Sequence, residues 1–492
     1  MTRLIKYVDL FLIVAFSTLY IFLSTRFTFW GDELFSVFYA KKGVIEFVKY
    51  YFHHPDPTHP IGYYFLLNLW QKIFNIGYAN DTWFRVFSIV FHFVAVILIA
   101  RKAFSQVNQR LWFIALCGVS SYFFTFSRMA RYYSLASLLY IIAFYFFYRW
   151  IKNKSDFRKW VITSVILLNV DYPTYLLFVI TSGCFFLEKK AKISLSESIK
   201  LGTTTFLGFL PVLYLFLVLA HQSSNQPWLF TSINIPKILL KIAMGFMMIP
   251  CHILFGEFFH PIISIGLGVG VIVLLVVLTQ KIWCSNDRVL RDCGLFLLFN
   301  SLALALLLST LVTRYPIFSF SRFLLPCAYA FFYLMVKLLD TSKGSLVGLL
   351  LINICVLGLN IEKKYFINPI LFYPTDQVAT LIHKYPQAQL LANTSKSDIQ
   401  DPYSYFIRRN FPQRIQEPGQ LDPTKSYFTV LDVRLESSVE SQIQDLRNQY
   451  PAYTVNTVGF DNITRPNKLF MKRYFGVVCD YKYYACVLTK SK

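Results

Sequence analysis

The chain has 492 residues, of which 55% are hydrophobic, 18% aromatic and 15% charged, and its formal net charge is +22. A soluble protein of this length cannot hide so much apolar surface, because its exterior has to be largely wetted. The sequence therefore predicts an α-helical integral membrane protein. Its basic residues lie mainly in short loops between apolar runs, which indicates membrane orientation and lipid headgroups rather than nucleic acid.

Eleven apolar segments are predicted to form transmembrane helices, because a helix needs about 20 mostly apolar residues to cross the hydrocarbon core. In chain order they span 7–26, 84–100, 111–127, 133–148, 160–170, 174–187, 201–219, 262–280, 294–312, 323–338 and 345–360. The fifth and sixth are short and are separated by Asp171-Tyr172-Pro173, where proline disfavours helix at the residue before it. One kinked segment is therefore the alternative to two spans.

The distribution of basic residues decides between these topologies. With eleven spans and a cytoplasmic N-terminus, the cytoplasmic loops hold 19 Lys and Arg residues in 58 positions, and the opposite side of the membrane part holds 12 over a longer stretch. An excess of Lys and Arg marks cytoplasmic loops. The N-terminal apolar run has no A-x-A-like cleavage site and is predicted to be an uncleaved anchor. We therefore expect a multi-pass protein of the cell (plasma or inner) membrane.

Three segments are predicted outside the cytoplasm, namely 27–83, 220–260 and 361–492. The last one alternates amphipathic helix patterns with strand-like runs, which predicts a small extracytoplasmic α/β domain after a transmembrane domain at 1–360. The helices expected in it are Asp376–Tyr385 and Ser437–Tyr450, and the strands are Ser426–Val433 and Tyr453–Phe460.

The first outer segment begins with two adjacent carboxylates in Trp30-Gly31-Asp32-Glu33. A charged pair at a membrane surface carries a desolvation cost, which favours a functional role. Asp32 and Glu33 are therefore candidate catalytic residues, and a carboxylate at this depth suits a general base. The alternative is an acidic pair in the first turn of a helix over Leu34–Tyr39, which the helix dipole favours.

The same segment contains the His-rich run His53-His54-Pro55-Asp56-Pro57-Thr58-His59-Pro60, which leads into Ile61-Gly62-Tyr63-Tyr64. Three histidines and an aspartate could ligate a metal, but their spacing matches no closed zinc motif. The alternative is that these histidines only donate hydrogen bonds at the interface. The need for a divalent metal stays open.

Arginine residues recur at the outer ends of the predicted spans. They are Arg85, Arg128, Arg131, Arg314 and Arg322. Guanidinium groups at headgroup depth suit bidentate binding of phosphate. The alternative is snorkelling to lipid phosphates, which is expected for Arg128 and Arg314. Asp171 lies at the outer end of two spans, where it could pair with one of these arginines or line a cavity.

In their order along the chain, these motifs resemble those of GT-C-fold glycosyltransferases, in particular glycosyltransferase family 39 with its protein O-mannosyltransferases and lipid A aminoarabinose transferases. Asp32-Glu33 resembles the acidic motif of their first external loop, and His59-Pro60-Ile61-Gly62-Tyr63-Tyr64 resembles their HPPLYY-like element, with Ile-Gly in place of Pro-Leu. Ala130-Arg131-Tyr132-Tyr133-Ser134-Leu135 is similar to their AR-x-Y-x-L segment. Ser321-Arg322-Phe323-Leu324-Leu325-Pro326 resembles their ERYLLP-like sequence. The resemblance covers about residues 1–360.

The resemblance implies the transfer of a sugar from a polyprenyl-phosphate-linked donor to an acceptor hydroxyl at the outer face of the membrane, with inversion. Asp32 would be the general base, and Arg131 and Arg322 would hold the lipid phosphate as it leaves. Glu33 and His59 would orient the acceptor or the base. The residues expected to contact substrate are His59, Tyr63, Arg85, Arg131, Tyr132, Asp171 and Arg322.

The expected partners are the polyprenyl-phosphate sugar, a glycan, lipid or protein acceptor, and membrane lipids, with no nucleic acid. Some members use an additional carboxylate that has no match here, since Glu46 and Asp56 are poorly placed by sequence, and no cofactor is assigned. The main rival function is a lipid or solute transporter, which internal repeats and mid-membrane charges would favour. A scaffold that displays the tail would not need the acidic pair together with several outer arginines.

Overall fold

The protein is described here from a computed structural model. It describes residues 2–53, 60–76, 81–191, 193–222, 251–256, 266–270, 282–285, 287–311, 322–340, 342–362, 373–393, 401–432, 437–460 and 483–490, with residues 273, 276 and 280. We call residues 2–361 the helical region and residues 373–490 the C-terminal region.

Five helices of the described residues are long and apolar enough to cross a membrane. They are α1 (Thr2–Ser24), α5 (Asp81–Ala103), α8 (Tyr133–Asn153), α15 (Leu325–Leu339, extended to Arg322 by a 3-10 turn) and α16 (Lys343–Ile361). The pair α6 (Val107–Val119) and α7 (Ser121–Ser127) makes a sixth if its 63° bend lies within one span. The helical region thus has the character of a membrane protein.

Every predicted span except 262–280 coincides with a helix of the structure. The further matches are α9 (Phe157–Val170), α10 (Tyr172–Glu188), α11 (Leu195–Gln222) and α14 (Arg288–Leu311). Most of 262–280 lies outside the described residues. The number eleven itself stays a prediction, because α9 and α10 have only 14 and 17 residues and a helix that crosses the bilayer core needs about 20.

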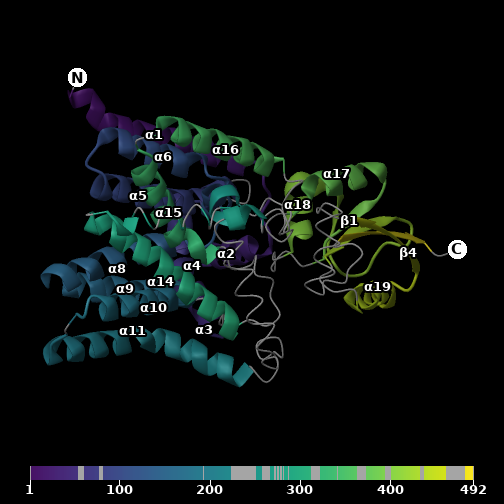
Figure 1. The fold of residues 1–492 in the computed structure, drawn as a ribbon. Helices are drawn as coiled ribbons and strands as arrows, with labels where there is room; N and C mark the ends of the chain where they lie inside the picture. The colour runs from purple at the N-terminus through teal and green to yellow at the C-terminus, as the bar shows by residue number, and fades with distance from the viewer. Residues whose placement is uncertain are drawn as a thin grey trace.

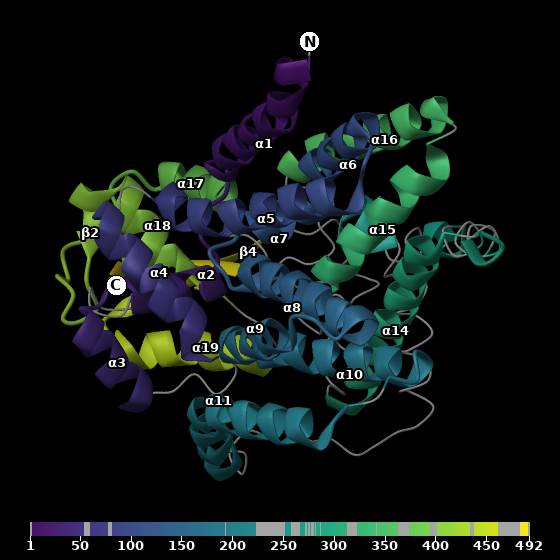
Figure 2. The same ribbon diagram turned by 90° about the vertical axis from the view of Figure 1, so that its left-hand side faces the viewer.

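The break predicted at Asp171 is confirmed. α9 ends at Val170, and α10 begins at Tyr172 with Pro173 in its first turn, where proline needs no backbone hydrogen bond. Both helices pack on α8, α11 packs on α9 and α14 packs on α10. Figures 1 and 2 show α8, α9, α10 and α11 below α5 and α6. The stretch therefore folds as two separate helices rather than one kinked segment.

The first outer segment contains three short helices in its described residues, and a helix was considered from the sequence only for the first of them. They are α2 (Gly31–Lys41), α3 (Val44–His53) and α4 (Ile61–Phe74). Figure 1 shows α2 on the side of the helical region that faces the C-terminal region, opposite the N-terminal end of α1. The acidic pair thus lies at the end of the bundle that the C-terminal region covers.

The C-terminal region is the α/β structure that the sequence predicts. Its five-stranded sheet has the order β2-β1-β3-β5-β4, in which β1 is parallel to β2 and β3, and β5 is antiparallel to β3 and β4. The elements are α17 (Thr375–Lys384), β1 (Gln389–Leu391), α18 (Pro402–Asn410), β2 (Ile415–Gln416), β3 (Tyr427–Asp432), α19 (Ser437–Gln449), β4 (Tyr453–Phe460) and β5 (Tyr483–Lys490). All four predicted elements are confirmed, whereas β1, β2, β5 and α18 were not predicted.

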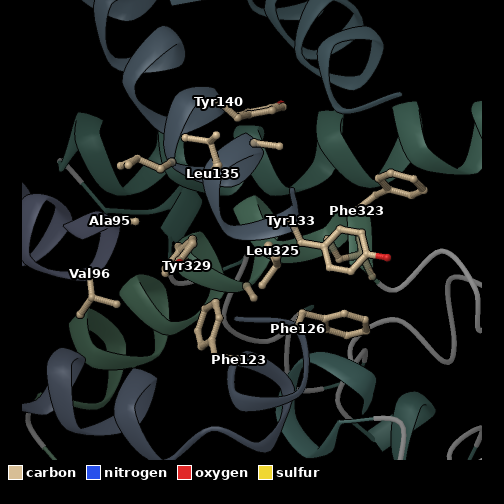
Figure 3. Packing of buried hydrophobic residues seen from close by; sticks show 14 of the residues in the cluster. Ala95, Val96, Phe123, Phe126, Tyr133, Leu135, Tyr140, Phe323, Leu325 and Tyr329 are labelled. Atoms are coloured by element: carbon tan, nitrogen blue, oxygen red, sulfur yellow. The ribbon is translucent and has the colours of Figure 1, made fainter. Parts of the chain in front are cut away.

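The core of the helical region is rich in aromatic rings. Phe123 and Tyr329 stack with ring centroids 4.5 Å apart, and they lie next to each other in Figure 3. The Tyr329 hydroxyl lies 2.6 Å from Nδ1 of His92, which is itself fully buried. These contacts join α5, α7 and α15 at the centre of the bundle.

Candidate active site

The two carboxylates of the acidic pair lie in the first turn of α2 and have opposite environments. Trp30 is extended and α2 begins at Gly31, so the acidic pair lies in the first turn of a helix, as the alternative interpretation expected. The Glu33 side chain is fully buried, whereas 41% of the Asp32 side chain is exposed. Adjacent residues of a helix point about 100° apart. This rotation buries the Glu33 carboxylate inside the protein and leaves the Asp32 carboxylate partly exposed.

Glu33 forms a buried bidentate ion pair with Arg85 of α5. Nε and Nη2 of Arg85 each lie 2.8 Å from a carboxylate oxygen of Glu33. The same carboxylate accepts the Ala130 N–H at 2.9 Å, and Nη1 of Arg85 donates to the main-chain oxygens of Ser24 and Phe27. Parallel N–H···O bonds of this kind fix geometry as well as charge. The pair therefore ties α2 to α1, to α5 and to the segment that carries Arg131.

Arg131 lies against Asp32 from the other side. Its Nη1 donates to the Asp32 main-chain oxygen at 3.1 Å, and its Nη2 is 3.8 Å from Oδ2 of Asp32. Nη1 also reaches the hydroxyls of Ser36 and Tyr64, at 3.2 and 3.3 Å. The Arg131 side chain is almost fully buried, so its charge acts in a medium where electrostatic interactions are strong. A fixed cation beside an exposed carboxylate is thus the centre of the site.

Tyr63 supports Arg131 from α4. Its hydroxyl lies 3.3 Å from that of Ser88, and Ser88 donates to the Arg131 main-chain oxygen at 3.1 Å. α4 can come this close to α9 only because residue 62 is glycine. A Cβ at Gly62 would lie 2.4 Å from the main-chain oxygen of Asn169. This contact is a physical reason for the Ile-Gly that replaces Pro-Leu in the motif.

Arg322, at the start of the α15 span, is the second cation of the site. Its Nη1 donates to the Tyr133 hydroxyl at 3.1 Å, and its guanidinium lies over the rings of Tyr133 and Phe323, at 5.6 and 5.1 Å. Figure 3 shows these two rings on neighbouring elements beside Phe126. Within the described part of the chain, Nε of Arg322 is buried and has no hydrogen-bond partner. A buried donor without a partner costs free energy, which an acceptor on a ligand would recover.

Tyr132 fills the space between the two arginines. It is fully buried, the Arg131 guanidinium lies 5.2 Å from its ring, and its ring packs on that of Tyr133 at 4.7 Å. Asp171, Arg322 and Arg131 all act electrostatically on the Tyr132 hydroxyl. Predicted residues from two separate motifs, together with Asp171, are therefore brought together around this ring.

Asp171 faces the same arginines from the turn between α9 and α10. Its Oδ2 accepts the N–H of Thr174 at 3.0 Å and also the Thr174 hydroxyl, which caps α10. Burial raises the pKa of Asp171 to about 6, and the Thr174 hydrogen bonds, Arg322 and Arg131 oppose this rise. Among the described residues, Oδ1 of Asp171 has no hydrogen-bond partner. The Asp171 carboxyl is therefore buried near both arginines of the site.

Arg128 is not the snorkelling residue that the sequence suggested. It is fully buried, and its guanidinium lies 3.8 Å above the ring of Phe27 and 5.7 Å from that of Phe124. Its guanidinium nitrogens have no hydrogen-bond partner within the described residues. Burial, together with the nearby charge of Arg85, lowers the pKa of Arg128 to about 9. Local sequence could not show that α7 ends inside the protein and carries Arg128 with it.

Two predicted residues cannot be placed. His59 and Arg314 lie outside the described residues, as do His54 and Asp56. Within the described ranges, no group of three or more His, Cys, Asp or Glu side chains could hold a metal ion. The metal question of the His-rich run is therefore untested.

Three positions that the sequence reading missed complete the site. Ser36 follows Asp32 by one helical turn, and Ser88 follows Arg85 by nearly one, so helical spacing from a candidate residue is the signal that finds them. Tyr64 was quoted in the motif but was not selected. Its hydroxyl accepts from Arg131 at 3.3 Å.

No protein-family model and no curated protein sequence matches this chain. Two solved structures resemble it, both of ArnT from Cupriavidus metallidurans and therefore of the transferase group that the motifs resemble. The structure bound to undecaprenyl phosphate has a TM-score of 0.47 at 10% identity, and the apo structure has a TM-score of 0.41 at 11% identity. Each comparison covers 97% of both chains. Since both TM-scores are below 0.5, the proposals below rest on the geometry of this chain.

Proposed function

We propose that this protein is a membrane glycosyltransferase that moves a sugar from a polyprenyl-phosphate-linked donor to an acceptor hydroxyl at the outer face of the membrane, with inversion. The observation that carries the proposal is the partly exposed Asp32 carboxylate 3.8 Å from the buried guanidinium of Arg131. A carboxylate that solvent and an acceptor can reach, beside a fixed cation, meets the needs of a general base and of a phosphate site in one place.

In the proposed reaction, Asp32 accepts the proton of the acceptor hydroxyl while the acceptor oxygen attacks the anomeric carbon. The bond between that carbon and the phosphate oxygen breaks, and the electron pair leaves with the lipid phosphate. A single displacement of this kind inverts the anomeric configuration. Arg131 and Arg322 stabilise the negative charge that grows on the phosphate. Electrostatic stabilisation of this kind is usually the largest single contribution to catalysis.

The remaining residues position Asp32, Arg131 and Arg322. Glu33 keeps both of its carboxylate oxygens on Arg85 and Ala130, so it holds the start of α2 in place rather than contacting the acceptor. We assign Arg85 the same role. Tyr132 and Asp171 form the wall between the arginines, and Asp171 offsets part of their positive charge before the donor binds.

The outer membrane face is proposed from charge and arrangement. The loops predicted in the cytoplasm hold most of the basic residues of the membrane part, and the site lies at the end of the bundle next to the C-terminal region, away from the N-terminal end of α1 (Figure 1). We therefore place the N-terminus in the cytoplasm, and the site and the C-terminal region outside it.

A lipid-product experiment tests this function. Purified protein in liposomes would be incubated with lipid-linked sugars and with a cell-envelope extract as acceptor source, both from its own cells, and the products would be examined by mass spectrometry. Undecaprenyl phosphate, the lipid bound to ArnT in one of the similar structures, is the first product to seek. A glycosyltransferase releases polyprenyl phosphate and forms a new glycoside in equal amounts. A transporter would move the lipid-linked sugar to the other leaflet unchanged, which would refute the proposal.

A further inference from the structure

Tyr405 of α18 connects the C-terminal region to the core of the helical region. It is the one residue beyond position 361 that belongs to the buried hydrophobic cluster of the helical region, as far as the structure describes the chain. Its neighbours in α18, Tyr403, Phe406 and Ile407, instead pack into the core of the C-terminal region. Tyr405 is only 3% exposed, so this contact is a buried one.

The ring of Tyr405 packs on Phe29, which is fully buried just before the acidic pair. Their ring centroids are 5.7 Å apart. Phe29 also contacts Arg85, whose guanidinium lies 4.7 Å from the Phe29 ring. Arg85 in turn holds Glu33 by two hydrogen bonds of 2.8 Å. A continuous row of contacts therefore runs from the C-terminal region to the residue next to Asp32.

We infer that Tyr405 is a positioning residue for the reaction of Asp32, acting through Phe29, Arg85 and Glu33. The Phe29 ring packs against the Arg85 guanidinium and so helps to hold it where it donates both hydrogen bonds to Glu33. Without the Tyr405 ring, Phe29 gains room to move, and the first turn of α2 loses a support. The effect of Tyr405 on catalysis rests on the proposed function, whereas the contacts described above do not depend on it.

The first test measures this support without any substrate. The Ala130 N–H donates to Glu33, so its hydrogen exchange reports whether the Glu33–Arg85 pair is in place. In the full-length protein, Tyr405→Leu keeps the apolar volume but removes the ring, and Tyr405→Phe keeps the ring. We expect exchange in the peptide that contains Ala130 to rise by about tenfold in Tyr405→Leu, as expected for loss of one aromatic contact, and to stay at the wild-type rate in Tyr405→Phe.

Phe406→Leu is the matched control, because it removes a ring from the same helix on the side that faces the C-terminal sheet. It should accelerate exchange in β1 and β3 but not at Ala130. Equal acceleration at Ala130 by Tyr405→Leu and Phe406→Leu would mean that only general loosening is observed, and would overturn the inference. A wild-type rate of exchange in the Ala130 peptide of Tyr405→Leu would also overturn the inference.

The second test uses turnover. With lipid extract as donor source, Tyr405→Leu should lower kcat about tenfold with little change in KM, since it shifts Asp32 but leaves Arg322 in place. A rise in KM with an unchanged kcat would contradict the inference. If the wild-type protein transfers no sugar, the proposed function fails, whereas the exchange result at Ala130 still decides the role of Tyr405.

Discussion

The Glu33–Arg85 ion pair gives the most specific prediction for stability. Glu33→Gln keeps the shape of the side chain but places an amide N–H against the Nη2 of Arg85, where the carboxylate oxygen was 2.8 Å away. Both side chains are at most 2% exposed, so water cannot replace the lost acceptor. Removing one partner of such a buried pair costs about 3–5 kcal/mol, because the other charge is left uncompensated.

A double-mutant cycle in detergent tests this value. The free energy of unfolding would be measured for Glu33→Gln, for Arg85→Met and for the variant that carries both substitutions. We expect each single variant to lose about 3 kcal/mol or more and the combined variant to lose clearly less than their sum, because it leaves no unpaired charge. Glu46→Gln is the control, since Glu46 pairs with Lys42 in an exposed ion pair worth at most about 1 kcal/mol.

The reasoning would be refuted if Glu33→Gln were as stable as Glu46→Gln. Additive losses in the combined variant would also refute it, because they would mean that the two side chains do not stabilise the fold as a pair.

Three further predictions follow from other contacts. Arg322→Leu should weaken binding of the proposed polyprenyl phosphate about 10- to 100-fold in a vesicle assay, the cost of losing a hydrogen bond to a charged group, and unchanged binding would contradict the proposed role. Gly62→Ala should lower the free energy of unfolding by about 1–3 kcal/mol, because the new Cβ meets the Asn169 oxygen at 2.4 Å; a neutral effect in thermal unfolding would contradict this. For Asp171 the fold favours the protonated carboxyl, because its pKa is raised from 3.8 to about 6. Its contribution to stability is therefore fully present below pH 3.8 and is lost as the pH rises through about 6. Asp171→Asn should remove this dependence when the free energy of unfolding is measured between pH 4 and pH 7. The same pH dependence in the variant as in the wild type would contradict this prediction.

Apolar runs and amphipathic periods predict the long helices of the helical region and half of the elements described above for the C-terminal region. Tyr453–Phe460 was predicted and observed with identical bounds, and Ser437–Tyr450 ends only one residue beyond α19. Such patterns depend on which residues are buried along one element, and the local sequence records this directly. β5, by contrast, lies between β3 and β4, and all of its pairing is with distant residues.

The sequence selects the individual residues of the candidate site, but it does not predict which of them pair with one another. Asp32, Arg131 and Arg322 were selected from charge and position, and the first two lie within 3.8 Å of each other. Arg85 was expected to contact substrate, yet it binds Glu33, which is 52 positions away in the sequence. Spacing cannot reveal such a partner, because it depends on how α2 and α5 meet in the fold. The same reason explains why the burial of Arg128 was missed.

The most direct measurement of the central claim compares the wild-type protein with Asp32→Asn in two assays, sugar transfer and binding of lipid-linked sugar. The variant removes the proton acceptor but keeps the main-chain oxygen that Arg131 contacts. We predict that turnover falls about 10²–10⁴-fold while binding stays within a few-fold of wild type. Transfer at the wild-type rate by Asp32→Asn would contradict the account.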